Sequence, residues 1–227
     1  MDTGGLAERL RTMSMEMGAD LFGISDARLF LNDEYLGNRP QDVMENCRSV
    51  LVLGVRIPSG CLSTLPRGRG EYTNTLMAGT ATLRIMAFKL AAEIEREGFL
   101  ATLVPSEGSE FGYWYADRRT LMGDVSIKYA GFLAGLGDFG LNHLLITKEH
   151  GPRVRMTAIM TDAPFAAGEP TDGLVNEMCA GCKRCVDICP SGAIGADGTM
   201  DRGKCARYMF EELEGLRCGL CVKVCPL

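Results

Sequence analysis

The first part of the chain alternates between apolar residues at helical spacing and short runs that are apolar throughout. A stripe at helical spacing in residues 1–17 predicts a core helix, and Gly18 is suited to end it. Residues 20–25 and 50–55 are short apolar runs without alternation, which is typical of buried strands. We expect the second of these strands at the centre of a sheet. The helical stripe is formed by Leu6, Leu10, Met13 and Met17.

The next segment changes from irregular to regular spacing. Residues 58–74 are rich in Pro, Gly and Ser and show no periodicity, so they predict a long surface loop. Near Thr75 the helical spacing returns and predicts a long helix that Gly98 ends. Residues 99–104 then predict a strand that is stopped by Pro105.

The residues before the cysteine-rich end predict one more helix and two more strands. Apolar positions in residues 122–136 predict the helix, and residues 143–147 and 154–160 predict two strands joined as a hairpin. Residues 163–170 are rich in Pro, Gly and Ala and predict a linker. The pattern favours an α+β protein of two domains. The expected domains are residues 1–165 and residues 171–227.

Composition and charge exclude several classes of protein. Hydrophobic residues make up 46% of the 227 residues, and no apolar run approaches the roughly 18 residues that a membrane span needs. The net charge of −5 argues against general nucleic-acid binding, which needs concentrated basic residues. The first residues lack the basic and apolar blocks of a secretory signal, so we expect a cytoplasmic protein.

The strongest chemical signal is a pair of cysteine motifs near the end of the chain. Residues 179–190 read C-x2-C-x2-C-x3-C-P, in which three thiolates ligate one iron–sulfur cubane and the fourth ligates a second cluster. Residues 218–226 repeat C-x2-C-x3-C-P but have Gly215 where another cysteine would stand, so we expect Cys205 to supply the missing ligand. The spacing therefore predicts two [4Fe-4S] clusters. The expected ligands are Cys179, Cys182, Cys185 and Cys225 for cluster one, and Cys189, Cys205, Cys218 and Cys221 for cluster two.

Zinc and disulfides are the alternatives for these eight cysteines. Zinc sites usually place their C-x2-C pairs well apart along the chain, and a C-x2-C-x2-C run packs thiols too closely for outward pairing. If Cys205 does not reach cluster two, that site would hold a three-iron cluster or take a ligand other than cysteine. Cys47 and Cys61 lie far from the motifs in sequence, and we expect them to be dispensable small hydrophobic residues.

Two further segments are candidates for binding a planar ligand. Residues 106–119 gather aromatic side chains without helical or strand spacing, which either line a ligand or pin this loop to the core. Residues 135–142 match G-x-G-x-x-G, but the predicted helix precedes them and a strand follows, the reverse of the order in a Rossmann site. The glycines still indicate a tight turn where a ligand can approach the backbone closely. The candidate binding residues are Tyr113, Trp114, Gly135, Gly137, Gly140 and Asn142.

Taken together, these motifs resemble the epoxyqueuosine reductase family, and the architecture is similar to the catalytic region of corrinoid reductive dehalogenases. Residues 17–26 look like the family's opening. The resemblance implies a nitroreductase-like α/β domain followed by a ferredoxin-like module with two [4Fe-4S] clusters, and a base-off cobalamin between the domains. The more distinctive matching segments are residues 134–142, 144–147, 151–153 and 161–164, followed by the two cysteine motifs.

The sequence departs from that family in three respects. It lacks the C-terminal extension of the tRNA-modifying members and the twin-arginine leader of the dehalogenases. The acidic residue that the family has before the central helix falls near Leu121 in a gap-free count. We therefore expect a short relative rather than an enzyme of queuosine biosynthesis.

The resemblance implies an oxidoreductase in which the clusters pass electrons to cobalamin for the reduction of a small substrate. Its expected partners are that substrate and a low-potential electron donor of the ferredoxin or flavodoxin type. The alternatives are an electron carrier without an organic cofactor and a flavin-dependent reductase on the same scaffold. A tyrosine beside a cation is suited to donate a proton. The candidate catalytic residues are Tyr113, Tyr115, Lys128 and Tyr129.

Overall fold

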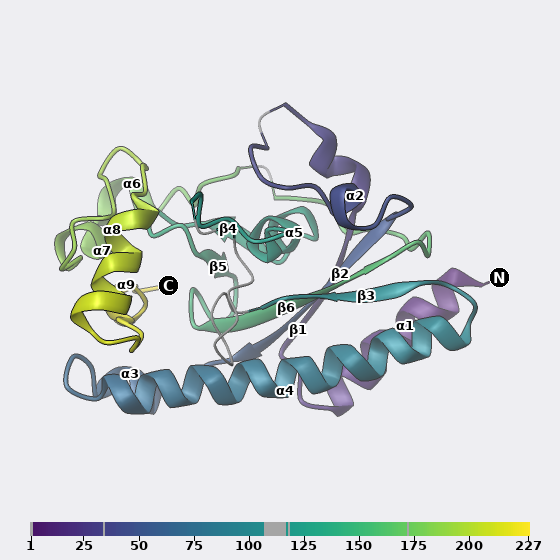
Figure 1. The fold of residues 1–227 in the computed structure, drawn as a ribbon, viewed down its shortest axis with the longest axis horizontal. Coiled ribbons are helices and arrows are strands. Elements are labelled where there is room, and N and C mark those ends of the chain that lie inside the picture. Colours follow the sequence, from purple (N-terminus) through teal and green to yellow (C-terminus); the bar gives the residue numbers. More distant parts are fainter. Residues whose placement is uncertain (1, 34, 107–116, 118, 172) are drawn as a thin grey trace. The chain divides into compact units, whose positions relative to one another are not determined.

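The structure is a computed structural model, and it describes residues 2–33, 35–106, 117, 119–171 and 173–227 (Figure 1). The chain forms two compact units, each assembled from three segments. Unit 1 consists of Met1–Val55, Thr80–Leu136 and Arg155–Thr171, and unit 2 consists of Arg56–Gly79, Gly137–Val154 and Asp172–Leu227.

A four-stranded sheet is the centre of unit 1. Its strands lie in the order β1 (Leu21–Asp26), β2 (Ser49–Arg56), β6 (Val154–Thr161) and β3 (Ala101–Val104). The pairs β1–β2 and β3–β6 are antiparallel. Strand β2 is an interior strand and is buried along almost its whole length, which confirms the central strand predicted from its unalternated apolar run.

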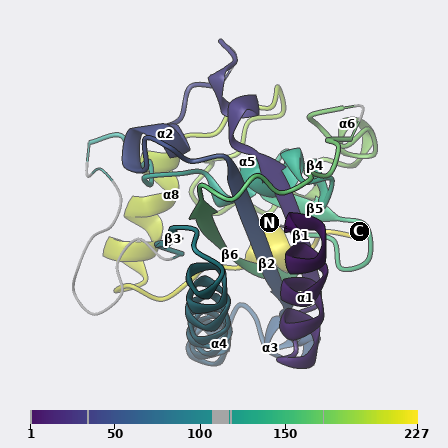
Figure 2. The ribbon, with the colours of Figure 1, turned by 90° about the vertical axis from the view of Figure 1, so that its right-hand side faces the viewer.

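Two helices cover one face of this sheet. Helix α1 (Thr3–Glu16) and the second half of α4 (Arg69–Arg96) lie side by side (Figure 2). Both helices end at a left-handed glycine, as the sequence predicts, because Gly18 has φ of 93° and Gly98 has φ of 87°. The core between helices and sheet contains Leu6, Leu10, Leu51, Leu53, Leu83, Met86, Leu90, Ile94 and Ile159.

The predicted surface loop over residues 58–74 is wrong. This segment contains helix α3 (Ser59–Ser63) and the beginning of α4, which starts six residues before Thr75. Its apolar side chains are buried in a second hydrophobic cluster instead of facing solvent. The Pro and Gly residues lie between and at the ends of the helices, so the composition of the segment concealed two helices. The cluster contains Ile57, Cys61, Leu62, Leu65, Tyr72, Leu76 and Val222.

The predicted hairpin of residues 143–147 and 154–160 is also wrong. Strand β5 (Leu145–Thr147) pairs with β4 (Gly137–Phe139), whereas β6 lies in the four-stranded sheet. The chain turns at Gly151, which bridges back to Thr147. The preceding helix α5 (Ile127–Leu133) is shorter than the predicted span, and it begins where the Ser126 side chain accepts a hydrogen bond from the Tyr129 N–H.

The remaining elements are short. Unit 1 contains the 3₁₀ helix η1 (Ala27–Leu31) and helix α2 (Pro40–Val43). Among the described residues, no helix combines the length and apolar character that crossing a membrane requires. Unit 2 contains α6 (Cys179–Cys182), α7 (Arg184–Asp187), α8 (Arg202–Arg207), the π-helix η3 (Tyr208–Glu212) and α9 (Leu220–Lys223).

Candidate iron–sulfur centres

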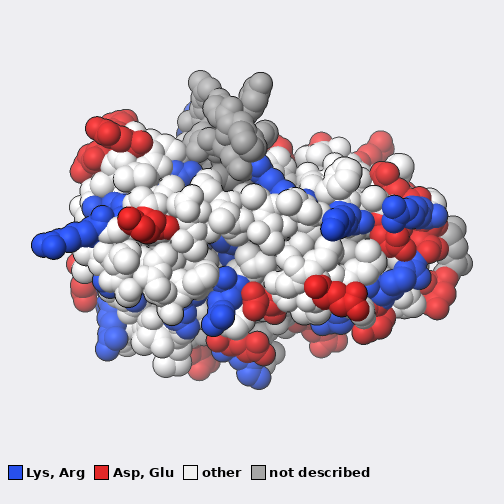
Figure 3. Space-filling model, turned by 90° about the horizontal axis from the view of Figure 1, so that it is seen from below, with Lys and Arg blue, Asp and Glu red and all other residues white. Residues whose placement is uncertain are grey.

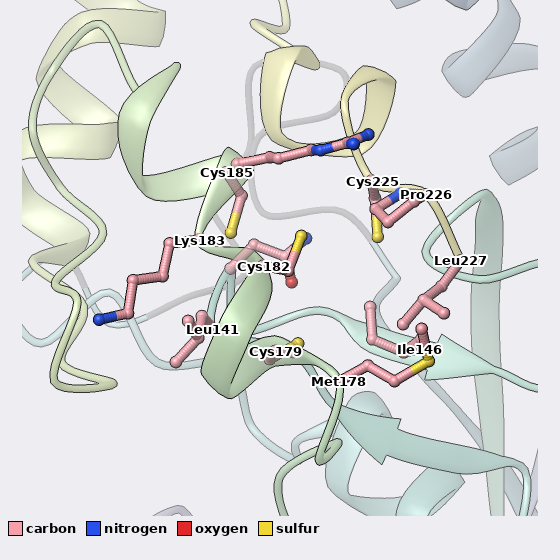
Figure 4. A pocket seen from close by; sticks show the side chains of 13 residues that line it. Leu141, Ile146, Met178, Cys179, Cys182, Lys183, Cys185, Cys225, Pro226 and Leu227 are labelled. Carbon is pink, nitrogen blue, oxygen red and sulfur yellow. The ribbon is translucent and has the colours of Figure 1, made fainter.

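Four of the cysteines in unit 2 line a single pocket, and we call them group one. They come from three places in the chain: helix α6, helix α7 and the segment after α9. Figure 4 shows their side chains around a common space. The group consists of Cys179, Cys182, Cys185 and Cys225, the set predicted for cluster one. Apolar side chains complete the lining, among them Leu141, Ile146, Met178 and Leu227.

A break in the helix explains why three closely spaced cysteines face the same pocket. Helix α6 ends at Cys182 and is capped by Lys183, which has φ of 48° and directly precedes α7. The left-handed residue turns the chain, so that Cys185 reaches the pocket already lined by Cys179 and Cys182. The first three cysteines of the motif can therefore face one pocket because the backbone turns at Lys183.

The electrostatics of group one show that its thiols lie close enough to repel one another as thiolates. Burial raises the pKa of Cys185, and negative charge on Cys179 and Cys225 raises it further. Burial also raises the pKa of Cys225, with further contributions from Cys179 and Cys182, while the Leu227 N–H and the Arg153 charge lower it. Iron would relieve this repulsion, because it binds thiolates and supplies positive charge.

The other four cysteines, Cys189, Cys205, Cys218 and Cys221, form group two. Burial raises the pKa of Cys221 to about 12, and charges on Cys218 and Cys205, then on Cys185 and Cys189, add to the shift. The charge on Cys205 thus acts on Cys221, as do charges on the other cysteines of this group and on Cys185 of group one. The role of Cys205 as a ligand of cluster two remains a prediction.

Cys189 differs from the other members of group two because hydrogen-bond donors surround it. Burial raises its pKa, but hydrogen bonds from the Ser191 side chain and from the N–H groups of Ala193, Ile194 and Ser191 outweigh burial, and the pKa is lowered. The Cys189 Sγ to Ser191 Oγ distance is 3.5 Å. These donors favour the thiolate, which is the form that ligates iron.

The donor set fits two iron–sulfur clusters. Four of the eight thiols line one pocket, charges on the members of group two and on Cys185 act on Cys221, and none of the ten cysteines forms a disulfide. Among the described residues, no three His, Cys, Asp or Glu side chains form the tight cage of a single metal ion. The four thiols around a cubane lie further apart than the ligands of a single metal ion, because each thiolate ligates a different iron atom. The assignment of each cysteine to a cluster remains a prediction.

The two remaining cysteines have different surroundings. Cys47 is buried in unit 1, where its Sγ lies 3.6 Å from the Ser49 carbonyl oxygen, and burial raises its pKa to about 11. Cys61 lies far from the motifs in sequence, but it belongs to the hydrophobic cluster of unit 2, against which Cys221 packs. Cys61 therefore lies close to group two in space, and its dispensability remains a prediction.

The glycine-rich turn does not offer bare backbone to a ligand as its sequence suggests. A side chain at Gly137 would lie 2.2 Å from the Ile146 carbonyl oxygen, and one at Gly135 would lie 2.5 Å from that of Glu169. Close packing against the protein's own backbone accounts for both glycines. Gly140 and Asn142 line the group-one pocket instead, where Asn142 Oδ1 accepts a hydrogen bond from the Leu144 N–H at 3.1 Å.

Of the predicted catalytic residues, the structure describes two. Lys128 and Tyr129 lie on α5, and the Tyr129 hydroxyl accepts a hydrogen bond from Asn32 Nδ2 at 3.0 Å. The Tyr129 ring stacks on Tyr35 with ring centroids 4.5 Å apart. These contacts give Tyr129 a structural role in unit 1, and its catalytic role remains a prediction. Tyr113, Trp114 and Tyr115 lie outside the described residues.

Sequence reasoning missed a residue beside group one. Arg153 Nη1 donates a hydrogen bond to the Leu227 main-chain oxygen at 2.7 Å, and Leu227 lines the pocket. The G-P-R sequence at residues 151–153 was a signal, because Gly before Pro indicates a turn. Nothing in a one-dimensional pattern indicated which segment packs on that turn.

The comparisons with known proteins support iron–sulfur clusters in this part of the chain. A family model described as a 4Fe-4S dicluster domain matches residues 178–227, which contain all eight cysteines of the two groups. An epoxyqueuosine reductase of Bacillus cereus is 32% identical over an alignment of 117 residues, and the alignment covers 46% of this chain and 30% of the relative. A tetrachloroethene reductive dehalogenase of Dehalobacter restrictus is 34% identical over 162 residues, which are 71% of this chain and 25% of the relative.

Solved structures share the fold over nearly the whole chain. A structure reported to suggest a mechanism for B12-dependent dehalogenation matches with a TM-score of 0.75 and 22% identity, covering 96% of this chain and 31% of that one. A crystal structure of epoxyqueuosine reductase with a modified tRNA stem loop matches with a TM-score of 0.69 and 19% identity. The match covers 99% of this chain and 66% of that one. The chain spans less than a third of the length of the two curated relatives. The resemblance noted in the sequence is thereby confirmed.

Proposed function

Because the chain is a relative of the epoxyqueuosine reductases and the reductive dehalogenases and carries a 4Fe-4S dicluster domain, we propose that it is an iron–sulfur oxidoreductase. In this proposal cluster one is held by group one and cluster two by group two. The clusters supply one-electron transfer when bound. The protein supplies the thiolates, the hydrogen bonds to their sulfur atoms and an apolar lining that limits the access of water.

The observation that carries this proposal is the pocket lined by the four thiols of group one within the segment that the dicluster family model matches. The family match covers the segment, and the geometry adds that Cys225, forty residues beyond Cys185, lines the same pocket as the first three cysteines. A crossed ligand pattern of this kind is characteristic of proteins with two cubanes. Two clusters of this kind form a short path for single electrons.

We extend the proposal to cobalamin as the electron acceptor and to a nitroreductase-like fold for residues 1–165. The support is the likeness to dehalogenase structures, one of which is described as B12-dependent. The described residues add no cradle for a corrin, since Gly135 and Gly137 are packed against backbone. We therefore derive no reaction step through cobalamin. A flavin on the same scaffold is the alternative, although the comparisons give it no support.

A titration of the reconstituted protein tests the acceptor. Protein with intact clusters is mixed anaerobically with hydroxocobalamin, and the visible spectrum is followed across a micromolar range. Binding in the base-off form, with reduction of the bound cobalamin by dithionite-reduced clusters, would support the proposal. An unchanged spectrum with intact clusters would favour the electron-carrier alternative, and a parallel titration with flavin mononucleotide distinguishes the flavin alternative.

The partners proposed here are a low-potential electron donor of the ferredoxin or flavodoxin type and a small substrate, in the cytoplasm. Basic and acidic side chains are interspersed on the face in Figure 3, without a continuous basic stripe. This mixture and the net charge of −5 favour a small substrate over general nucleic-acid binding. A solved epoxyqueuosine reductase is bound to a tRNA stem loop, so a gel-shift assay with tRNA is the matching control. Binding of tRNA at physiological salt would contradict this part of the proposal.

A further inference from the structure

The segment after α9 is held against a tight turn at residues 151–153. Gly151 has φ of 55°, and a side chain there would lie 2.0 Å from the Leu227 main-chain oxygen. Only glycine allows the two segments to approach so closely. Because Cys225, Pro226 and Leu227 all line the group-one pocket, the turn supports the part of the chain that carries the fourth thiol of this group.

Arg153 fixes this segment from the turn. Its Nη1 donates a hydrogen bond to the Leu227 main-chain oxygen at 2.7 Å. The backbone of Arg153 is itself anchored on both sides, because its N–H donates to the His150 oxygen at 3.1 Å and its carbonyl accepts from the Ile57 N–H at 2.8 Å. The guanidinium is half-buried, so its charge is less screened than that of a surface arginine. Arg153 therefore joins Leu227 to an anchored part of the backbone and carries a positive charge, and we call this link the clamp.

The clamp acts directly beside a cluster ligand. Leu227 follows Cys225 by two residues, and both line the group-one pocket, so the guanidinium that is bonded to Leu227 holds a positive charge at the wall of this pocket. A nearby cation stabilises negative charge on ligating sulfurs. Reduction of a cubane adds one electron and increases the negative charge that the ligating sulfurs share.

We propose that Arg153 is a positioning residue that raises the reduction potential of cluster one. It does so by its own charge, which is held at the wall of the group-one pocket, and by fixing Leu227 and with it the segment that carries Cys225. The inference rests on the proposed function, because it requires a cluster bound by group one. It assigns a task to a residue that touches neither a cysteine ligand motif nor the predicted corrin site.

Three substitutions separate the charge from the clamp. Arg153→Met removes both and keeps an unbranched apolar stem. Arg153→Gln removes the charge and retains an N–H donor, whereas Arg153→Lys retains the charge without the guanidinium geometry. Arg155→Met is the matched control, since Arg155 lies two residues further along the chain and donates to the Thr80 hydroxyl at 2.9 and 3.1 Å.

The measurement is an anaerobic redox titration followed by electron paramagnetic resonance, with iron and sulfide determined for each sample. At the wild-type midpoint of cluster one, Arg153→Met should lower the ratio of reduced to oxidised cluster about tenfold, a shift of about 59 mV to more negative potential for a one-electron couple. Arg153→Gln and Arg153→Lys should each give a smaller shift in the same direction. Cluster two and the Arg155→Met protein should keep their wild-type midpoints.

The outcomes distinguish this inference from the proposed function. If the wild-type protein binds no iron–sulfur clusters, the proposed function fails. If the clusters are intact and Arg153→Met leaves both midpoints unchanged, or moves both equally, the inference about Arg153 is wrong. Should Arg153→Met lose a cluster, Arg153→Gln decides the matter by the same criterion. Repeating the titration in a Cys205→Ala background, where only group one keeps its four cysteines, shows whether the shifted midpoint belongs to cluster one.

Discussion

Group one and group two each contain four cysteines, but the surroundings of these cysteines differ between the groups. Group one lines a pocket whose walls are largely apolar, and burial raises the pKa of Cys185 and Cys225 although backbone N–H groups oppose it, those of Cys185 and Val186 at Cys185 and that of Leu227 at Cys225. In group two, Cys189 has donors from Ser191, Ala193 and Ile194, whereas Cys221 packs against a hydrophobic cluster. Within group two, the surroundings therefore favour the charged form of Cys189 and the neutral form of Cys221.

This difference shows how a protein prepares thiols for metal. The hydrogen bonds to Cys189 lower its pKa and so favour its thiolate form. The pKa of Cys221 is raised to about 12, so this thiol stays protonated until a metal displaces the proton. Hydrogen bonds and exposure also set cluster potentials, so we expect the two clusters to titrate at different midpoints.

The largest effect on cluster content is expected when one ligand is removed from each group in turn. Cys225→Ala should abolish cluster one or convert it to a three-iron form while cluster two keeps its spectrum, and Cys205→Ala should do the reverse. Iron content and electron paramagnetic resonance of the two proteins check this. Loss of both clusters in either protein would contradict two separate ligand sets. An unchanged Cys205→Ala spectrum would show that another group ligates cluster two.

Cys61→Ala is the matched control for these ligand variants. Because Cys61 lies in the hydrophobic cluster beside Cys221, its removal should lower stability by about 1 kcal/mol while the iron content stays at about eight. Loss of cluster two in Cys61→Ala would contradict the assignment of Cys205.

A second prediction concerns the backbone that places group two. Gly219 lies between Cys218 and Cys221 with φ of 69°, and a side chain there would lie 2.4 Å from the Tyr72 ring. Gly219→Ala should therefore destabilise the protein by roughly 2 kcal/mol or more, measured by chemical denaturation. Gly181 lies between Cys179 and Cys182, one position later in its pair than Gly219, and a side chain there would meet no atom of the described residues within 4 Å, so Gly181→Ala should be nearly neutral. Equal effects at the two positions would contradict the difference described here.

Cys47 tests what burial alone does to a thiol outside both groups. Its pKa is raised from an ordinary 9.0 to about 11, so the neutral thiol stabilises the folded state below pH 9 and this contribution is lost as the pH rises towards 11. The stability difference between the wild-type protein and Cys47→Ala should shrink between pH 8 and pH 10.5, by roughly 2 kcal/mol at most. Anaerobic urea titrations at both values measure it. A difference that stays constant or grows would show that the Cys47 pKa is not raised.

The smallest expected effect is at Ser191. Ser191→Ala removes one of several donors to Cys189, so cluster two should become slightly harder to reduce while cluster one is unchanged. A redox titration of the variant detects this change. A larger shift at cluster one than at cluster two would mean that Cys189 ligates the other cluster.

The sequence predicted elements whose signals are local. Helix α1, strand β2 and the glycine ends of two helices follow from spacing and from single residues with positive φ. The sequence also predicted the four cysteines that line the group-one pocket, whereas the ligand set of cluster two remains a prediction. All eight expected ligands lie within the fifty residues of the family match, so this prediction needed little tertiary information.

The misses depended on contacts between distant segments. Residues 58–74 form helices because Leu62, Leu65 and Tyr72 pack in a cluster with Val222, which no local pattern indicates. Strand β6 joins β3 instead of β5, and strand pairing of this kind is decided by tertiary packing. The glycines of the turn were interpreted as ligand contacts, although backbone at Ile146 requires one of them.

The central claim is that this chain holds two [4Fe-4S] clusters in separate ligand sets. The most direct test is Mössbauer spectroscopy of anaerobically reconstituted protein, combined with chemical analysis of iron, zinc and acid-labile sulfide. The account predicts about eight iron atoms and about eight sulfides per chain, with all iron in cubane environments. A value near four iron atoms, or zinc in place of iron, would contradict it.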